Sequence, residues 1–328
     1  MDTPDYTIFG SPISLFTRKL EAALELYGAP FIVERKDDGN REALEQRSGT
    51  HQIPVLKTSE NWMLADTTPI LMLLDSRFSQ RRLFPPGPLG VLVHIIEEVL
   101  DEWTARVMVH YRWHYDDNTQ AVVRELLKRE VTVKEARNFP LAQWGLRACR
   151  ATGTEMATQQ TVAEREYLGI LTALQTQLQE TQFSLGDRPC AADAILIGGL
   201  RGHTNNDPIP DLSEFPTVLE WDKQVSRYNG TNGNWDAFPG STPFAKHMLK
   251  LAREQYKPFI IGNRKAIASG DKAFTVTTYG EKVSYLCRPY PERSRQMIVN
   301  RICQLERDDR GAVIEWLGDI GLDNCFLD

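Results

Sequence analysis

Two serines lie near the start of the chain, where an apolar strand is expected to pass into a helix. Residues 6–9 predict the strand, and residues 15–27 have the periodic apolar pattern of an amphipathic helix. The free N–H groups and the dipole of a helix start favour negative charge. Ser11 or Ser14 could therefore donate a hydrogen bond to a bound thiolate and lower its pKa, although either serine could simply cap the helix. A serine without a neighbouring base is a poor nucleophile, so the attacking group would belong to the ligand.

A second motif, Ile53-Pro54, precedes the apolar run that begins at Val55. A cis bond before Pro54 would turn backbone N–H and C=O groups outward, and Val55 could then pair with an extended, peptide-like ligand as a strand would. An ordinary trans proline at the start of a strand explains the same residues, and spacing alone favours that simpler interpretation.

A third motif, Asp66-Thr67-Thr68-Pro69, stands where another helix is expected to begin. Aspartate and threonine at a helix start, with proline in the first turn, are typical of a cap. The functional alternative is that Asp66 binds the ammonium group of a ligand, while Thr67 and its N–H bind a carboxylate. Each of the three motifs is weak alone, and their order and spacing raise the odds of a shared site.

The elements that must position these motifs form one compact unit. A strand, a helix and a strand, followed by a strand led by Pro54, a further strand and a helix, predict an α/β domain of about 80 residues. The Pro- and Gly-rich residues 84–88 predict a linker. Residues 91–240 have helical periodicity, and a β-hairpin is expected near residues 273–288. We therefore expect an α/β domain, an all-α domain and an extra C-terminal α+β segment, with the boundaries 1–83, 91–240 and 241–328.

Composition excludes several classes of function. The chain has 328 residues, with 38 basic and 44 acidic side chains and a net charge of −6. This balance argues against wholesale binding to nucleic acid or to an anionic membrane. No apolar run approaches the roughly 20 residues that span a bilayer, and the first residues do not resemble a signal peptide. The five scattered cysteines predict neither a disulfide framework nor a metal site. We therefore expect a reduced, cytoplasmic protein without a metal.

Taken in order, the three motifs resemble a known family. Residues 6–83 resemble the glutathione-binding, thioredoxin-like domain of the cytosolic glutathione transferase superfamily, through Ser11-Pro12-x-Ser14, Gln52-Ile53-Pro54-Val55 and Asp66-Thr67. The segment from Gly186 to Asp193 is similar to the capping motif of that superfamily's helical domain, with Cys190 in place of the usual Ser or Thr. A thiol is a weaker acceptor than a hydroxyl, so we expect this departure to affect helix stability more than activity.

The resemblance implies a role for each matching residue. Ser11 matches the position of the catalytic hydroxyl or cysteine, with Ser14 as the other candidate serine. The remaining positions match contacts to glutathione: Gln52 near the cysteinyl-glycine part, Val55 with backbone bonds to the cysteinyl unit, and Asp66 with Thr67 at the γ-glutamyl head. Ile53 and Pro54, between Gln52 and Val55, are expected to belong to the same glutathione site. No cysteine lies in the first 148 residues, so disulfide exchange is disfavoured.

An aromatic and basic run ends the first long helix expected in the all-α region. In the superfamily that helix flanks the pocket for the second substrate. Tyr111 and Tyr115 lie four residues apart on one face, with Arg112 beside them. They could bind an electrophile and stabilise developing negative charge. The alternative, slightly favoured, is that the helix end packs against the C-terminal segment while Arg112 pairs with an acid such as Asp116.

The resemblance implies a glutathione transferase that uses glutathione as co-substrate, needs no metal and acts on a small hydrophobic electrophile. Ser11 would lower the pKa of the bound thiol and so create the attacking thiolate. Two alternatives stay open. One is a glutathione-dependent isomerase or lyase, and the other is a non-catalytic glutathione-binding or scaffolding protein. A homodimer of the superfamily's usual kind is a further expectation, which the C-terminal segment could prevent by covering that surface.

Overall fold

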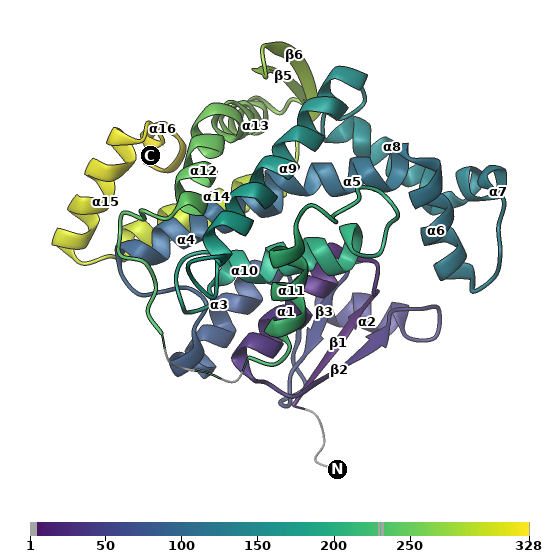
Figure 1. The fold of residues 1–328 in the computed structure, drawn as a ribbon, viewed down its shortest axis with the longest axis horizontal. Coiled ribbons are helices and arrows are strands. Elements are labelled where there is room, and N and C mark those ends of the chain that lie inside the picture. The colour runs from purple at the N-terminus through teal and green to yellow at the C-terminus, as the bar shows by residue number, and fades with distance from the viewer. Residues whose placement is uncertain (1–4, 229, 231–232, 328) are drawn as a thin grey trace.

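The computed structural model describes residues 5–228, 230 and 233–327. The chain begins with an α/β domain and continues as a helical region that carries one β-hairpin (Figure 1). The fold class expected from the sequence is therefore correct: a thioredoxin-like domain is followed by a helical one. Of the residues within the predicted domain boundaries, 1–4, 229, 231–232 and 328 lie outside the described ones.

The α/β domain is built on a sheet with the strand order β2-β1-β3-β4. β1 is parallel to β2, whereas β3 is antiparallel to both β1 and β4. The elements of this domain are β1 (Tyr6–Gly10), α1 (Leu15–Tyr27), β2 (Phe31–Arg35), α2 (Arg41–Ser48), β3 (Val55–Lys57), β4 (Met63–Ala65), α3 (Thr67–Arg77) and the short η1 (Ser79–Arg81).

Strand alternation explains why helices cover both faces of this sheet. Ile8 and Leu56 belong to the large core that also contains apolar residues of α1 and α3. Their chain neighbours Phe9 and Val55 point the other way and pack with Leu44 of α2. The domain is thus three layers thick.

The helical region follows a linker of residues 82–87. The first long helix expected in the all-α region is interrupted by a π-helical turn, η2, that separates α4 from α5. The helices are α4 (Pro88–Glu98), η2 (Val99–Thr104), α5 (Ala105–His114), α6 (Asp116–Leu127), α7 (Val133–Asn138), α8 (Pro140–Ala151), α9 (Ala157–Leu178), α10 (Ala191–Gly199), η3 (Leu200–Thr204) and α11 (Pro216–Val225).

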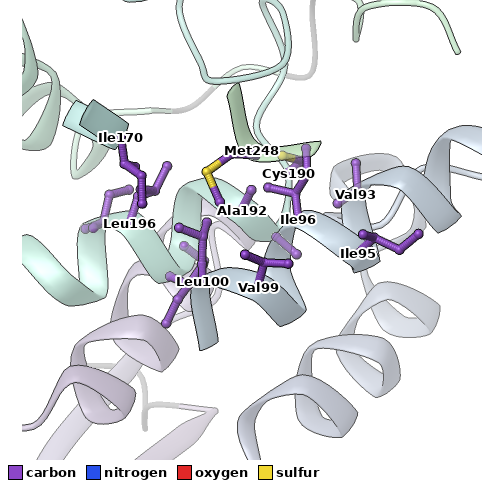
Figure 2. Packing of buried hydrophobic residues seen from close by; sticks show 14 of the residues in the cluster. Val93, Ile95, Ile96, Val99, Leu100, Ile170, Cys190, Ala192, Leu196 and Met248 are labelled. Atoms are coloured by element: carbon purple, nitrogen blue, oxygen red, sulfur yellow. The ribbon is translucent and has the colours of Figure 1, made fainter. Parts of the chain in front are cut away.

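The core of the helical region forms where α4, η2, α9 and α10 meet. Figure 2 shows Ile96 and Leu100 facing Ile170 and Leu196 in this contact. The predicted capping motif at the start of α10 is present, because the Asp193 carboxylate accepts hydrogen bonds from the backbone N–H of Cys190 (2.8 Å) and of Ser184 (2.9 Å). The sulfur of Cys190 leaves this aspartate arm of the capping box intact.

The C-terminal segment packs against the outer side of α4 through α12, α14 and α15 (Figure 1). The hairpin expected near residues 273–288 is present as β5 and β6, which pair in antiparallel fashion. The elements of this segment are α12 (Pro243–Leu251), η4 (Ala252–Tyr256), α13 (Lys257–Ser269), β5 (Ala273–Thr278), β6 (Glu281–Leu286), α14 (Pro289–Cys303), α15 (Arg307–Asp319) and α16 (Asp323–Phe326). In the described part of the chain, no helix has the length and apolarity needed to cross a membrane.

Glycines let α10 and η3 approach α1 at the interface between the two domains. A Cβ placed on Gly198 would lie 2.8 Å from the backbone O of Leu15 and from the backbone N of Lys19. A Cβ on Gly202 would lie 2.8 Å from the backbone N of Leu15. Because these neighbours are backbone atoms, neither contact can be relieved by a side-chain rotation.

We predict that Gly198→Ala lowers the free energy of unfolding by about 1–3 kcal/mol, as overpacking of a closed interface does. Urea denaturation measures the effect. Gly199→Ala is the matched control, because a Cβ there meets nothing closer than the Met108 side chain at 3.9 Å. Alanine is the better helix former by about 1 kcal/mol, so Gly199→Ala should be neutral or stabilising. Equal losses in the two variants would contradict the close backbone contact.

Candidate functional site

The three motifs singled out in the sequence meet at one end of the sheet. Phe9 of β1 stands opposite Val55 of β3, and Val55 stands opposite Ala65 of β4. The three residues therefore form one row across the sheet. Ser11 follows Phe9 by two residues, Pro54 precedes Val55 by one, and Asp66 follows Ala65 by one. Since β3 runs antiparallel to β1 and β4, the end of β1, the start of β3 and the end of β4 lie together. All three motifs therefore leave the sheet at the same edge, the one formed by these strand ends.

The two candidate serines have different local roles. Ser14 is the N-cap of α1, and its Oγ accepts a hydrogen bond of 3.3 Å from the backbone N–H of Thr17. The backbone N–H of Ser11 donates to Thr17 Oγ1 at 3.2 Å. Among the described residues, no side chain or backbone group is hydrogen-bonded to the hydroxyl of Ser11, which is partly exposed. The capping interpretation therefore applies to Ser14, and the Ser11 hydroxyl remains available to a ligand.

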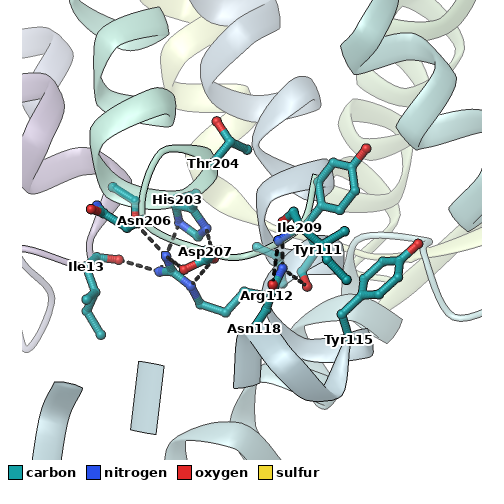
Figure 3. A network of polar contacts seen from close by, with 12 residues as sticks. Ile13, Tyr111, Arg112, Tyr115, Asn118, His203, Thr204, Asn206, Asp207 and Ile209 are labelled. Atoms are coloured by element: carbon teal, nitrogen blue, oxygen red, sulfur yellow. Dashed lines mark hydrogen bonds and ion pairs between the residues drawn. The ribbon is translucent and has the colours of Figure 1, made fainter. Parts of the chain in front are cut away.

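Two arginines hold the loop that carries these serines. Arg18 of α1 donates from Nε to the carbonyl oxygen of Pro12 at 2.9 Å. Arg112 of α5 reaches across from the helical domain and donates to the carbonyl oxygen of Ile13. Figure 3 shows Arg112 also paired with Asp207, at 2.9 Å from Nε and 3.0 Å from a terminal nitrogen. The serine loop is thus held from its own domain by Arg18 and from the helical domain by Arg112.

The polar groups of the aromatic and basic run on α5, expected to line a second-substrate pocket, are mostly buried or already hydrogen-bonded. Arg112 is only 3% exposed and its guanidinium is occupied by Asp207 and backbone carbonyls. Tyr111 is 2% exposed and belongs to the core, while the hydroxyl of the half-buried Tyr115 donates to Glu164 at 2.7 Å. This helix end packs mainly against α6, α8 and α9 rather than against the C-terminal segment, and the acid that pairs with Arg112 is Asp207 rather than Asp116.

The Tyr115 hydroxyl joins a cluster that contains Glu164 and two histidines. The Nδ1 atoms of His110 and His114 lie 2.8 Å apart, and His110 Nε2 lies 2.7 Å from Glu164. Burial lowers the pKa of His114 from 6.5 to about 4. Between pH 6.5 and about 4, His114 is therefore protonated in the unfolded chain but neutral in the folded chain. The stability due to neutral His114 is complete above pH 6.5 and is lost as the pH falls through about 4.

We predict that acidification from neutral pH to about 4 lowers the urea midpoint of the native chain more than that of His114→Gln, because glutamine binds no proton in this range. Denaturation curves of both chains at matched pH values measure the difference. A midpoint difference that does not change with pH would show that His114 is not held in its neutral form.

In the second motif, Ile53 and Val55 differ in whether their backbone is already paired with a neighbouring strand. The Ile53-Pro54 peptide bond is cis, so the trans interpretation favoured from spacing was wrong. Val55 has β1 on one side and β4 on the other, so pairing a ligand with its backbone would require displacement of a strand. Ile53 precedes β3 and has no strand partner there, and Gln52 beside it is exposed.

The third motif has an unusual backbone. Asp66 has φ 72° and ψ 115°, and its side chain makes no capping hydrogen bond to α3. Holding a non-glycine residue in such a conformation costs on the order of 1–3 kcal/mol, and residues of this kind concentrate at ligand sites. Burial raises the pKa of the Asp66 carboxyl, against the opposing effect of Lys19. Thr67 begins α3, where a helix leaves its first N–H groups unpaired.

A buried ionic cluster that the sequence did not predict lies behind the third motif. Lys19 of α1 is fully buried, and its Nζ lies 2.5 Å from Glu97, 2.9 Å from Asp101 and 3.2 Å from the hydroxyl of Thr68. One oxygen each of Glu97 and Asp101 has no hydrogen-bond partner among the described residues. The cluster joins α1, α3 and the α4–η2 junction, and its Lys19 and Glu97 act in opposite directions on the pKa of Asp66. A lysine on the apolar stripe of α1, between Leu15 and Ala23, was the available signal.

Comparison with protein-family models identifies the part of the chain that holds all three motifs. Residues 8–82 match the model described as "Glutathione S-transferase, N-terminal domain". The matched family is the one that the sequence of this segment resembled. Comparison with the curated proteins found no match.

Several solved structures have a similar fold. One is a glutathione S-transferase from Pseudomonas fluorescens Pf-5, with 19% identity over 69% of this chain and 96% of that chain and a TM-score of 0.41. A second is a theta class glutathione S-transferase from Xanthomonas axonopodis pv. citri with glutathione bound, with 16% identity, coverage of 70% and 95% and a TM-score of 0.46. The β-etherase LigF from Sphingobium sp. strain SYK-6 has 15% identity, coverage of 69% and 96% and a TM-score of 0.47.

Proposed function

We propose that the protein is a glutathione transferase that binds glutathione at the end of the sheet where the three motifs meet. The observation that carries the proposal is the row formed by Phe9, Val55 and Ala65, from which all three motifs leave the same edge of a domain that matches the glutathione S-transferase family model. Glutathione is a peptide with a thiol in its middle, and one edge can offer it a hydroxyl, backbone groups and an acid.

Each motif would meet one part of the ligand. The free hydroxyl of Ser11 would donate a hydrogen bond to the thiolate and so favour the ionised form. The backbone of Ile53, ahead of Pro54, would pair with the cysteinyl unit, with Gln52 beside the glycyl end. Asp66 would hold the γ-glutamyl ammonium, and the N–H of Thr67 would hold the neighbouring carboxylate. Val55 would support this contact by holding β3 in place.

The chemistry then follows from charge. An ionised thiol is the nucleophile, and it would attack a small hydrophobic electrophile to form a thioether, with the leaving group departing as an anion. The serine stays unmodified, because no base is hydrogen-bonded to its hydroxyl among the described residues. We place this reaction in the reducing environment of the cytoplasm, where glutathione is kept as a thiol.

Affinity for glutathione tests the site without depending on the electrophile. We predict that Asp66→Asn weakens binding of glutathione by about 10-fold or more, because a hydrogen bond to a charged group is worth about 1.5–3 kcal/mol. Isothermal titration calorimetry measures the dissociation constant. Asp38→Asn is the matched control, because the carboxylate of Asp38 is 93% exposed and pairs only with Arg41 among the described residues.

The outcome separates the remaining possibilities. Absence of glutathione binding by the native chain would refute the proposed function. Binding that Asp66→Asn leaves unchanged would move the γ-glutamyl head away from Asp66. A thioether formed from a chloro-nitro-aromatic electrophile shows conjugation, in which glutathione is incorporated. An isomerase or lyase regenerates glutathione, so the mass of its product would not include glutathione.

A further inference from the structure

A second cavity lies away from the proposed glutathione site, where the C-terminal segment meets the linker. It has a volume of ≈ 510 Å³ and is bounded by the end of α3, by linker residues 82 and 84–86, and by α14. We call it the linker cavity. Its walls combine apolar side chains (Met72, Phe84, Pro85 and Met297) with the polar side chains of Arg82, Asn300, Arg301 and Gln304.

Arg301 is the unusual member of this cavity. Its Nε donates to Nδ1 of the fully buried His94 at 3.2 Å, and its guanidinium lies over the ring of Phe84 at 4.7 Å. Burial lowers the pKa of Arg301, although Asp75 and Glu97 act from a distance in the opposite direction. In the described part of the chain no carboxylate forms an ion pair with this arginine. A half-buried cation without a paired anion is costly.

Arg301 lines the cavity, and its Nε is the nitrogen that the described residues occupy, in contrast to its terminal nitrogens. They make no hydrogen bond to any described residue, yet they are not among the buried atoms that lack a partner. They must therefore be accessible to solvent, and the cavity is the space that Arg301 borders. Arg82 adds a second guanidinium, of which only Nε is occupied by a described residue, the carbonyl oxygen of Ser79 at 3.2 Å.

The one acid of the cavity wall is already occupied. The carboxylate of Asp75 accepts hydrogen bonds from the hydroxyl of Tyr27 (2.6 Å) and from the backbone N–H groups of Leu83 (2.7 Å) and Phe84 (2.9 Å). These bonds direct both oxygens to the chain's own donors. Two guanidinium groups and the amides of Asn300 and Gln304 are therefore the groups that a ligand would meet.

We propose that the linker cavity binds an organic anion that carries a short apolar arm. Arg301 and Arg82 would hold the anionic group in bidentate fashion, while Met72, Phe84 and Met297 would cover the apolar arm. A carboxylate and a phosphate monoester share this chemistry. The site does not depend on glutathione, because none of the cavity's lining residues belongs to the three motifs.

Calorimetric titration with octanoate, octyl phosphate and octanol tests this proposal and separates the two anions. We expect at least one anion to bind, and octanol to bind about 10-fold more weakly or not at all, since it lacks the charge that the arginines pair with. Arg301→Gln should weaken binding of that anion by about 10-fold or more while keeping a hydrogen-bond donor near His94. Equal binding of octanol, or no binding of either anion, would overturn the proposal.

A second variant avoids the buried arginine. Gln304→Glu adds a negative charge at the rim of the cavity, at the exposed C-cap of α14. Gln179→Glu makes the same change at the exposed C-cap of α9, which does not line the cavity. We expect only Gln304→Glu to weaken binding of the anion, by several-fold, with an unchanged melting temperature in both variants. The same affinity in the two variants would refute the proposed location.

Discussion

Replacing Ser11 by alanine is expected to slow conjugation of glutathione at neutral pH by about 10- to 100-fold, while the chain stays folded. A hydrogen bond to an ionised group is worth about 1.5–3 kcal/mol, and its loss would raise the pKa of the bound thiol by about 1 to 2. The fraction of glutathione present as thiolate would fall accordingly. Steady-state kinetics with a chloro-nitro-aromatic electrophile measure kcat/KM for the native and variant chains.

Ser14→Ala should give the opposite result. Its Oγ caps α1, and loss of an N-cap costs about 1 kcal/mol of stability. We therefore expect a lower melting temperature and a smaller loss of rate than in Ser11→Ala. If Ser14→Ala carries the larger loss of rate and Ser11→Ala is fully active, the thiol is held by Ser14 and the proposed role of Ser11 is wrong.

Replacing Lys19 by methionine is expected to lower the free energy of unfolding by about 3–5 kcal/mol, as removal of one partner from a buried ion pair does. Glu97 and Asp101 would then share a buried space without their cation. Burial already raises the pKa of Asp101 to about 8 with Lys19 beside it, and without Lys19 this pKa would rise further. Since a protonated carboxyl needs no cation, the penalty should be smaller at acidic pH than at pH about 8.

Two comparisons make the Lys19→Met result specific, each measured by urea denaturation. Lys223→Met removes a lysine whose side chain is 69% exposed and which pairs with Glu220 at 3.7 Å on α11, so its effect should stay within about 0.5 kcal/mol. The triple variant Lys19→Met, Glu97→Gln, Asp101→Asn removes the charges together and should recover part of the loss. A penalty as small as that of Lys223→Met would show that the cluster is not closed to water.

The α/β domain could be predicted because its signals are local. A short apolar run, a proline before a strand and hydroxyl residues at helix starts each depend on a few neighbouring residues, and the strand β1 and the helix α1 lie where these signals placed them. The meeting of the three motifs at one end of the sheet depends instead on the pairing of β1, β3 and β4. That pairing has no local signal in the sequence, and it was expected only from the family resemblance.

The environment of α5 and of Lys19 could not be predicted in the same way. The spacing of Tyr111 and Tyr115 predicts that they share a helix face, but it does not predict which neighbour covers that face. The acid that pairs with Arg112 lies 95 residues further along the chain. Lys19 meets its acids across 78 and 82 residues. Contacts of that separation are set by how the two domains pack, so residue type and spacing within one helix cannot distinguish a buried support from a ligand contact.

The most direct test of the central claim is the pKa of the glutathione thiol in the complex, measured by ultraviolet titration of the thiolate. A free cysteine thiol has a pKa of about 8.5. We expect the bound thiol to lie below the value of free glutathione in the native chain, and to rise by about 1 to 2 in Ser11→Ala. A bound thiol with the pKa of free glutathione, or one that Ser11→Ala leaves unchanged, would contradict the claim that Ser11 activates the thiol of the ligand.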